Sequence, residues 1–228
     1  ELAISDHRSS QPTLNELLKI ASQAHVARLM TGKAGMLHLH LGDGERGLGL
    51  IRDALAHAEI PPRTYNPTHI NRQKFLFEEA CDLAKKGCWV DVTAFESGDV
   101  GYDPADALLR YMQQDLPQDK LTISSDGGGC LPDFHADGSL AKMDFADSQS
   151  MTNVFYELID NGEEVSQFLP FFTQNVAQLM NFHNKGHIAV GADADILIFD
   201  KQNRIEHVMA LGQLHVKHKQ QIKKGTFE

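Results

Sequence analysis

The chain contains 228 residues, and its 31 acidic side chains outnumber its 21 Lys and Arg side chains, so the formal net charge is −10. This charge argues against nucleic acid as a partner, because binding a polyanion requires a basic stripe and the sequence shows none. No apolar run approaches the roughly 20 residues that a membrane-spanning helix needs, so no membrane partner is expected.

Most of the chain alternates short apolar strands with helices. Strands are predicted over residues 2–4, 36–41, 64–69, 89–94 and 121–125. Helices are predicted over residues 14–30, 47–58, 74–86 and 104–114, with Thr13 as the cap of the first and Gly87 at the end of the third. This alternation indicates βαβ units and a parallel sheet, and hence an α/β fold.

The pattern changes after residue 145. Residues 149–183 are predicted to be helical, whereas residues 185–220 alternate apolar and polar side chains and carry glycine at turns. The second pattern predicts a small antiparallel element of three strands. We therefore divide the chain into an α/β part, residues 1–184, and a small β part, residues 185–228.

Four strand ends carry a carboxylate or an imidazole, namely Glu1, His40, His69 and Asp126. In a parallel α/β fold the carboxyl ends of the strands form the edge at which active sites lie. Imidazole nitrogen and carboxylate oxygen suit zinc and related ions, so these residues are candidate metal ligands. The alternative is structural, since a lone strand-end histidine is commonly a packed residue and Asp-Gly commonly forms a turn.

Two of these strand ends allow more specific interpretations. His38 and His40 point to the same side of one strand, but His38 lies deeper, so we interpret it as a packed or supporting histidine rather than a ligand. Asp126, in Ser-Ser-Asp-Gly-Gly-Gly, could bind metal and also accept a proton from a water activated by the ions.

Further candidates follow the strand ends. Arg8 and Arg72 could grip a substrate carboxylate with the planar guanidinium fork, or could be surface or salt-bridged arginines. Cys130 could be a small inert residue or a nucleophile, and the first interpretation is favoured. With Cys81 and Cys88, the chain has three cysteines. Their odd number, and the lack of a spacing typical of a disulfide framework, predict reduced thiols and a cytoplasmic location.

Taken together, the motifs ISDHRSS, HLGDG, PTHINR and SSDGGG and the ending KKGTFE resemble those of the isoaspartyl dipeptidases of the amidohydrolase superfamily. The resemblance runs along nearly the whole chain. It implies the C-terminal half of a (β/α)8 barrel, strands four to eight, followed by part of a small β-sandwich domain. The start within a strand at Glu1 leads us to expect further residues upstream, including an His-x-His metal pair.

The resemblance also implies roles for individual residues. Glu1, His40, His69 and Asp126 would bind two zinc ions that share a hydroxide, with Asp126 acting first as base and then as acid. Arg8, Arg72 and Cys130 would contact substrate. Two positions depart from the pattern, because Glu1 stands where a relative has lysine and Cys130 where it has serine.

The activity implied is hydrolysis of the isopeptide amide bond of β-aspartyl dipeptides, by a protein that forms homo-oligomers. Two alternatives remain open at this stage. One is a cyclic amidase of the same superfamily, similar to dihydroorotase or hydantoinase, and the other is a non-catalytic metal-binding assembly module.

Overall fold

Five parallel strands form the central sheet of the computed structural model, which describes residues 1–95, 98–135 and 137–225. The spatial order of the strands is their order along the chain. They are β1 (Leu2–Ile4), β2 (Leu37–Leu41), β3 (Tyr65–Thr68), β4 (Val90–Thr93) and β5 (Leu121–Ser124). The predicted parallel α/β fold is confirmed.

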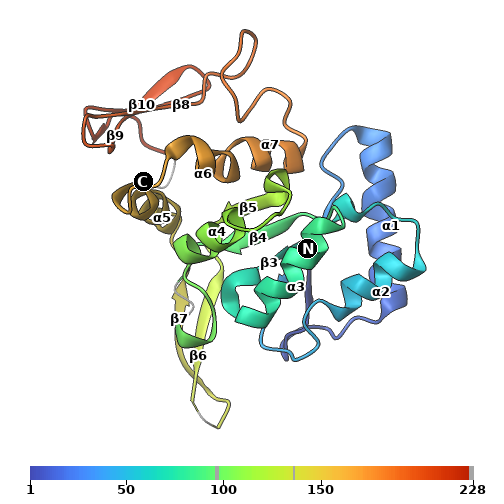
Figure 1. Ribbon diagram of the computed structural model, residues 1–228. Helices are drawn as coiled ribbons and strands as arrows, with labels where there is room; N and C mark the ends of the chain where they lie inside the picture. Colours follow the sequence, from blue (N-terminus) through green and yellow to red (C-terminus); the bar gives the residue numbers. More distant parts are fainter. Residues whose placement is uncertain (96–97, 136, 226–228) are drawn as a thin grey trace.

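Four helices connect these strands, and Figure 1 shows α2, α3 and α4 on one face of the sheet. They are α1 (Leu14–Thr31), α2 (Gly49–His57), α3 (Lys74–Lys85) and α4 (Pro104–Met112). The predicted cap of α1 is present, because Thr13 and Glu16 exchange hydrogen bonds in a capping box. After α3, Gly87 has φ of +95°, a left-handed conformation that glycine adopts without a steric penalty.

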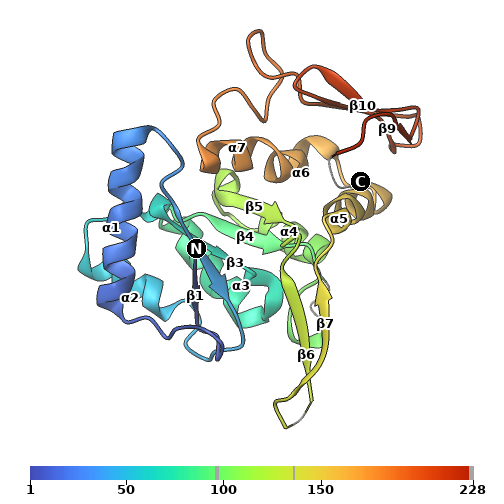
Figure 2. The ribbon, with the colours of Figure 1, turned by 180° about the vertical axis from the view of Figure 1, so that it is seen from behind.

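The two faces of the sheet differ in chemistry. On β2, Leu37, Leu39 and Leu41 are buried, while His38 and His40 between them point to the opposite face. The same alternation continues across the sheet and gives a polar face made of His38, His40, Asn66, Thr68, Asp91, Thr93, Thr122 and Ser124. Figure 2 shows the strands from the side away from α3. Strands covered on both faces are usually apolar on both, so this polar face indicates a functional role.

A β-hairpin follows β5 and was not predicted from the sequence. Strands β6 (Cys130–Phe134) and β7 (Leu140–Phe145) pair antiparallel, with Cys130 opposite Phe145. The hairpin extends away from the sheet in Figure 1. All six residues of β7 are exposed, so the segment lacks the buried apolar face that makes a strand recognisable in sequence.

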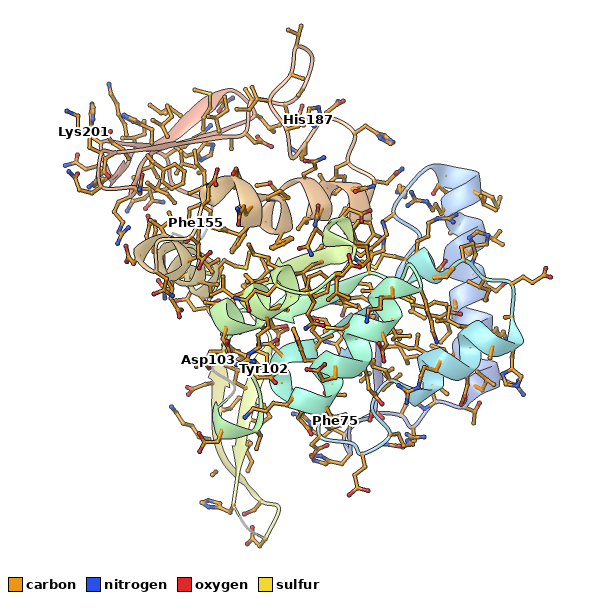
Figure 3. All side chains as sticks on the ribbon, viewed as in Figure 1. Phe75, Tyr102, Asp103, Phe155, His187 and Lys201 are labelled. Atoms are coloured by element: carbon orange, nitrogen blue, oxygen red, sulfur yellow. The ribbon has the colours of Figure 1, made fainter. Side chains whose placement is uncertain are left out.

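Three helices and a small sheet complete the chain. The helices α5 (Gln149–Asp160), α6 (Val165–Phe172) and α7 (Gln174–Met180) fall within the predicted helical segment. The antiparallel sheet contains β8 (Ile196–Phe199), β9 (Ile205–Ala210), β10 (Gln213–Lys217) and the two-residue β11 (Gln220–Gln221), one strand more than predicted. Phe155 of α5, labelled in Figure 3, stacks on Phe199 of β8 at 5.6 Å and so joins the sheet to the helices.

The division at residues 184 and 185 falls between α7 and β8 and stays a prediction. Residues 226–228, the end of the KKGTFE motif, lie outside the described part of the chain. Among the residues that the structure does describe, we find no helix with both the length and the apolar character needed to cross a membrane.

Candidate active site

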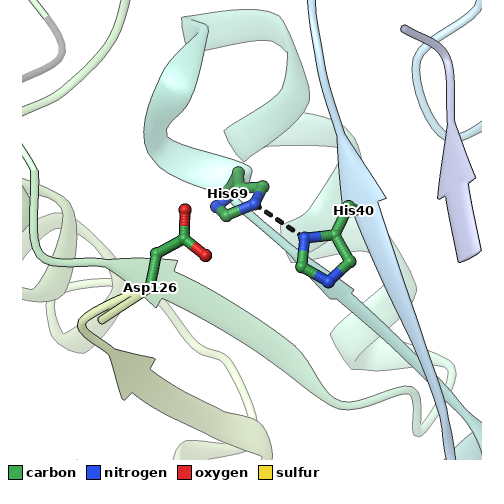
Figure 4. A group of neighbouring side chains, drawn as sticks. All are labelled: His40, His69 and Asp126. Carbon is green, nitrogen blue, oxygen red and sulfur yellow. Dashed lines mark hydrogen bonds between the residues drawn. The ribbon is translucent and has the colours of Figure 1, made fainter. Parts of the chain in front are cut away.

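Three of the predicted metal ligands meet at the carboxyl edge of the sheet. His40 ends the polar face of β2, His69 follows β3 directly, and Asp126 follows β5 by two residues. One ligand atom from each side chain lies within 4.8 Å of the other two. Figure 4 shows the Asp126 carboxylate near the two imidazole rings, with His40 Nδ1 and His69 Nε2 joined at 3.0 Å.

The protonation states of the two histidines suit metal binding. Burial lowers the pKa of His69 to about 3, and the charge of Arg72 adds to the effect. Burial also lowers the pKa of His40, with a further contribution from His38. Both rings are therefore neutral near neutral pH, which is the form that coordinates a metal ion.

The spacing of the donor atoms also fits a metal ion. Two nitrogens on one tetrahedral zinc lie about 3.3 Å apart, given Zn–N distances of about 2.0–2.1 Å. The nitrogens of His40 and His69 that face each other are 3.0 Å apart. The other ring nitrogen of His40, Nε2, does not belong to this pair; it is buried, has no hydrogen-bond partner among the described residues and lies 3.7 Å from Glu1 Oε2. A buried polar atom without a partner is unfavourable unless something else satisfies it.

The backbone at this edge adopts conformations that are uncommon for residues with side chains. Ser5, His69 and Asp126 have φ values of 51°, 64° and 54°. They follow β1, β3 and β5, so the left-handed turn recurs where the chain leaves alternate strands of the sheet. Such strain concentrates at functional sites, where surrounding contacts hold it in place.

One cavity of about 550 Å³ connects all the residues predicted to form the site. Its lining includes Glu1, Arg8, His40, His69, Arg72, Asp126 and Cys130. The structure thus brings together seven residues that are spread over 130 positions of sequence, and their individual roles stay predictions.

Glu1 is placed less tightly than the other candidate ligands. Its side chain is 77% exposed, and Glu1 Oε2 lies 3.7 Å from His40 Nε2. The compact group of three donors does not include it. Glu1 thus faces the same cavity next to His40, and its predicted role as a bridging carboxylate remains a prediction.

The two predicted substrate arginines differ in how they are held. Arg8 Nε and Nη2 donate to the two oxygens of Asp6, at 3.1 and 2.8 Å, and its backbone N–H donates to Asp6 Oδ1 at 2.7 Å. Arg72 donates to the Leu41 carbonyl at 3.2 Å and lies over the Phe95 ring at 5.4 Å. Burial and the nearby charge of Arg8 lower the pKa of Arg72. Both guanidinium groups therefore influence one region of the cavity, which favours an anion there.

The ISDHRSS and HLGDG motifs pack against each other. Ser5 Oγ donates to the Gly44 carbonyl at 2.8 Å, and the Gly44 N–H donates back to the Ser5 carbonyl at 2.7 Å. A Cβ at Gly42 would overlap the Asp6 carboxylate. Glycine at these positions thus allows the two loops to approach closely and to position Asp6 beneath Arg8.

The sequence interpretation of His38 agrees with its surroundings. His38 Nδ1 lies 2.7 Å from Asn66 Oδ1, and its ring meets that of His40 edge-on at 4.9 Å between centroids. His38 therefore packs beneath the site. Sequence reasoning missed Asp6, Asp91 and Thr93, although the alternating polar residues of β4 were a visible signal.

Known proteins resemble this chain in sequence and in fold. Residues 72–217 match the model of the amidohydrolase family. The crystal structure of beta-aspartyl dipeptidase from Fervidobacterium islandicum AW-1, in complex with beta-Asp-Leu dipeptide, has a TM-score of 0.91 and 36% sequence identity, covering 100% of this chain and 60% of that chain. A second structure of the enzyme from this organism matches with a TM-score of 0.86 and 34% sequence identity, covering 100% of this chain and 58% of that chain.

A D-hydantoinase from a Bacillus sp. AR9 matches with a TM-score of 0.63 and 16% identity, covering 97% of this chain and 65% of that chain. At this identity the match shows the fold alone. The predicted fold, the C-terminal half of a (β/α)8 barrel followed by part of a small β-sandwich domain, is confirmed by the parallel sheet, the antiparallel sheet and these matches. The chain spans about 60% of the length of the dipeptidase that it matches.

Proposed function

This chain belongs to the amidohydrolase family, and from that membership we propose that it forms part of an enzyme that hydrolyses β-aspartyl dipeptides with two zinc ions. The observation that carries the proposal is the single cavity that joins three donors, His40, His69 and Asp126, to two arginines, Arg8 and Arg72. Donors of this kind suit zinc, and paired guanidinium groups suit a carboxylate. The related dipeptidase with bound beta-Asp-Leu supports this substrate class.

His40 and His69 would hold zinc through the two nitrogens that face each other, with Asp126 as the third donor and Glu1 beside His40. Zinc, when bound, would polarise the scissile carbonyl and lower the pKa of a water molecule. Asp126 would accept a proton from the attacking water and then deliver it to the departing amine. The carboxylate lies near both imidazoles, as Figure 4 shows, and so borders the position that the ion would take.

Substrate selection would fall to the two arginines. Asp6 holds the Arg8 guanidinium at Nε and Nη2, which leaves Nη1 for a ligand. Arg72 reaches the same cavity from the turn after β3. In a β-aspartyl dipeptide the scissile amide is formed by the side-chain carboxyl group, so the α-carboxylate remains free. That carboxylate would bind between Arg8 and Arg72 while the β-amide faces Asp126.

The direct test compares two dipeptides of identical composition. The intact zinc-loaded protein should hydrolyse β-Asp-Leu and leave α-Asp-Leu intact. In β-Asp-Leu the α-carboxylate of the aspartyl residue is free and the side-chain carboxyl forms the amide, whereas in α-Asp-Leu these two positions are exchanged. Dihydroorotate and hydantoin complete the panel. Preferential turnover of a cyclic amide would favour the cyclic amidase, and stoichiometric zinc without any turnover would favour a binding module.

The cellular setting belongs to the same proposal. Cys81, Cys88 and Cys130 are all free thiols, and unpaired cysteines fit a reducing compartment, so we propose a cytoplasmic enzyme. Light scattering of the intact protein would test the expected homo-oligomer.

A further inference from the structure

The polar face of the sheet contains a buried carboxylate that has no place in the proposed reaction. Asp91 lies in the middle of β4 and is 3% exposed. Its Oδ2 is 2.6 Å from both Thr68 Oγ1 and Ser124 Oγ, and its Oδ1 is 2.6 Å from Thr122 Oγ1. These lengths are typical of hydroxyls that donate to an ionised carboxylate. All three hydroxyls donate to the carboxylate oxygens of Asp91.

This arrangement fixes the direction of the next hydrogen bond. Thr68 has one hydroxyl proton, and Asp91 receives it. At the contact between Thr68 Oγ1 and Thr93 Oγ1, 3.3 Å long, Thr68 can therefore only accept, so a hydrogen bond there uses the proton of Thr93. The hydroxyl proton of Thr93 is then committed as well.

The direction continues to the candidate metal ligand. Thr93 Oγ1 lies 2.9 Å from His69 Nδ1. With its proton directed to Thr68, Thr93 accepts here and His69 Nδ1 carries the hydrogen. Asn71 holds the backbone of Thr93 on both sides, through Thr93 N–H to Asn71 Oδ1 at 2.9 Å and Asn71 Nδ2 to the Thr93 carbonyl at 3.0 Å. Thr93 is fully buried, so water does not compete for its hydroxyl.

We propose that Asp91, acting through Thr68 and Thr93, selects the Nδ1–H tautomer of His69 and so directs the lone pair of Nε2 into the site. A neutral imidazole has a single ring N–H, so protonation at Nδ1 leaves Nε2 free to coordinate. His69 Nε2 is the nitrogen that faces His40 Nδ1. Asp91, Thr68 and Thr93 are thus positioning residues, since none of them touches the substrate cavity.

The inference rests on the proposed function only in assigning zinc to His69 Nε2. The tautomer of His69 can be measured whether or not the protein is a dipeptidase. The ¹⁵N NMR spectrum of the metal-free intact protein, labelled at histidine, distinguishes a protonated from an unprotonated Nδ1. We expect His69 to be protonated at Nδ1 in the wild-type protein. Protonation of His69 at Nε2 instead would overturn the proposal, and this measurement needs no variant.

Matched variants test the relay, by which we mean the chain of hydrogen bonds from Asp91 through Thr68 and Thr93 to His69. Thr93→Val and Thr68→Val keep the shape of the side chain but interrupt the chain of donors, and should weaken zinc binding by about 10–100-fold, as loss of a partner to a ligating histidine does. Thr93→Ser should restore the wild-type affinity. Thr122→Val is the control, because it removes a bond of equal length to the same carboxylate, at Oδ1, outside the relay.

Chelator competition with zinc gives the affinities, and circular dichroism confirms that each variant is folded. If Thr122→Val weakened zinc binding as much as Thr93→Val, the effect would be general loss of packing and the relay would be wrong. Failure of the proposed function gives a different pattern, in which the tautomer and the affinities follow the relay while β-Asp-Leu is not hydrolysed.

Discussion

Asp6 anchors Arg8, and replacing it with asparagine gives a prediction whose size follows from the structure. The carboxylate is nearly buried, at 8% side-chain exposure, and accepts three hydrogen bonds from Arg8. These bonds lower the pKa of Asp6 to about 2. An aspartate in an unfolded chain has a pKa of about 3.9, so the difference contributes about 2 kcal/mol to stability at neutral pH.

The sign of the pH dependence follows from the lowered pKa. The folded state holds the charged form more tightly than the unfolded state does, so the contribution is complete above about pH 4 and is lost as the pH falls toward 2. Asp6→Asn should therefore be less stable than wild type by about 2 kcal/mol at pH 7, and by roughly half of that at pH 3. Because Asp6 also orients Arg8, the variant should raise KM for β-Asp-Leu more than it lowers kcat.

Urea unfolding at the two pH values measures the difference, with the fluorescence of Trp89, the single tryptophan, as the signal. Asp43→Asn is the matched control in the neighbouring loop. Asp43 bonds to His7 but is 59% exposed, so its loss should cost less than about 1 kcal/mol. A stability difference for Asp6→Asn that does not shrink at pH 3, or that Asp43→Asn matches, would refute this reasoning.

Two further predictions concern the cavity. Arg72→Lys should raise KM for β-Asp-Leu about tenfold or more with a smaller change in kcat, because lysine cannot reproduce the planar fork or the packing on Phe95. An unchanged KM in steady-state assays would show that Arg72 does not bind substrate. In the metal-free protein, Cys130 should react with Ellman's reagent under native conditions. Cys81 and Cys88 should react only after denaturation, because burial raises the pKa of both thiols to about 12, and three equally fast thiols would contradict the structure.

The elements that position the candidate site could be predicted from local sequence. Each strand of the main sheet is a short apolar segment between helical segments, and the polar residue at its end is visible without knowledge of the fold. His40, His69 and Asp126 were therefore identified from position alone, and the structure brings them within 4.8 Å of one another. Parallel strands place their carboxyl ends at one edge, which is why a local pattern is sufficient here.

The supporting residues could not be predicted in the same way, because their partners depend on strand register. Asp91 accepts hydrogen bonds from hydroxyl groups on β3 and β5. Thr68 and Thr122 lie beside Asp91 only because of the register of the folded sheet. Asp6 was missed for a related reason. In sequence it is one acidic residue in a polar loop, and its contacts with Gly42 and Arg8 exist only in the folded protein.

The hairpin Cys130–Phe145 was missed because it lacks a buried face. Its strands pair with each other rather than with the main sheet, and every residue of β7 is exposed. Sequence periodicity reports burial, so an exposed hairpin leaves little signal.

In the proposed reaction, Asp126 transfers protons during zinc-dependent hydrolysis of a β-aspartyl amide. The most direct measurement is kcat/KM for β-Asp-Leu in wild type and Asp126→Asn, with zinc content determined on the same samples. At equal zinc content we expect the variant to lose about 10²–10⁴-fold in kcat/KM, the usual contribution of a positioned acid–base group. A variant that binds zinc normally and hydrolyses β-Asp-Leu at the wild-type rate would contradict the assigned role of Asp126 and the mechanism built on it.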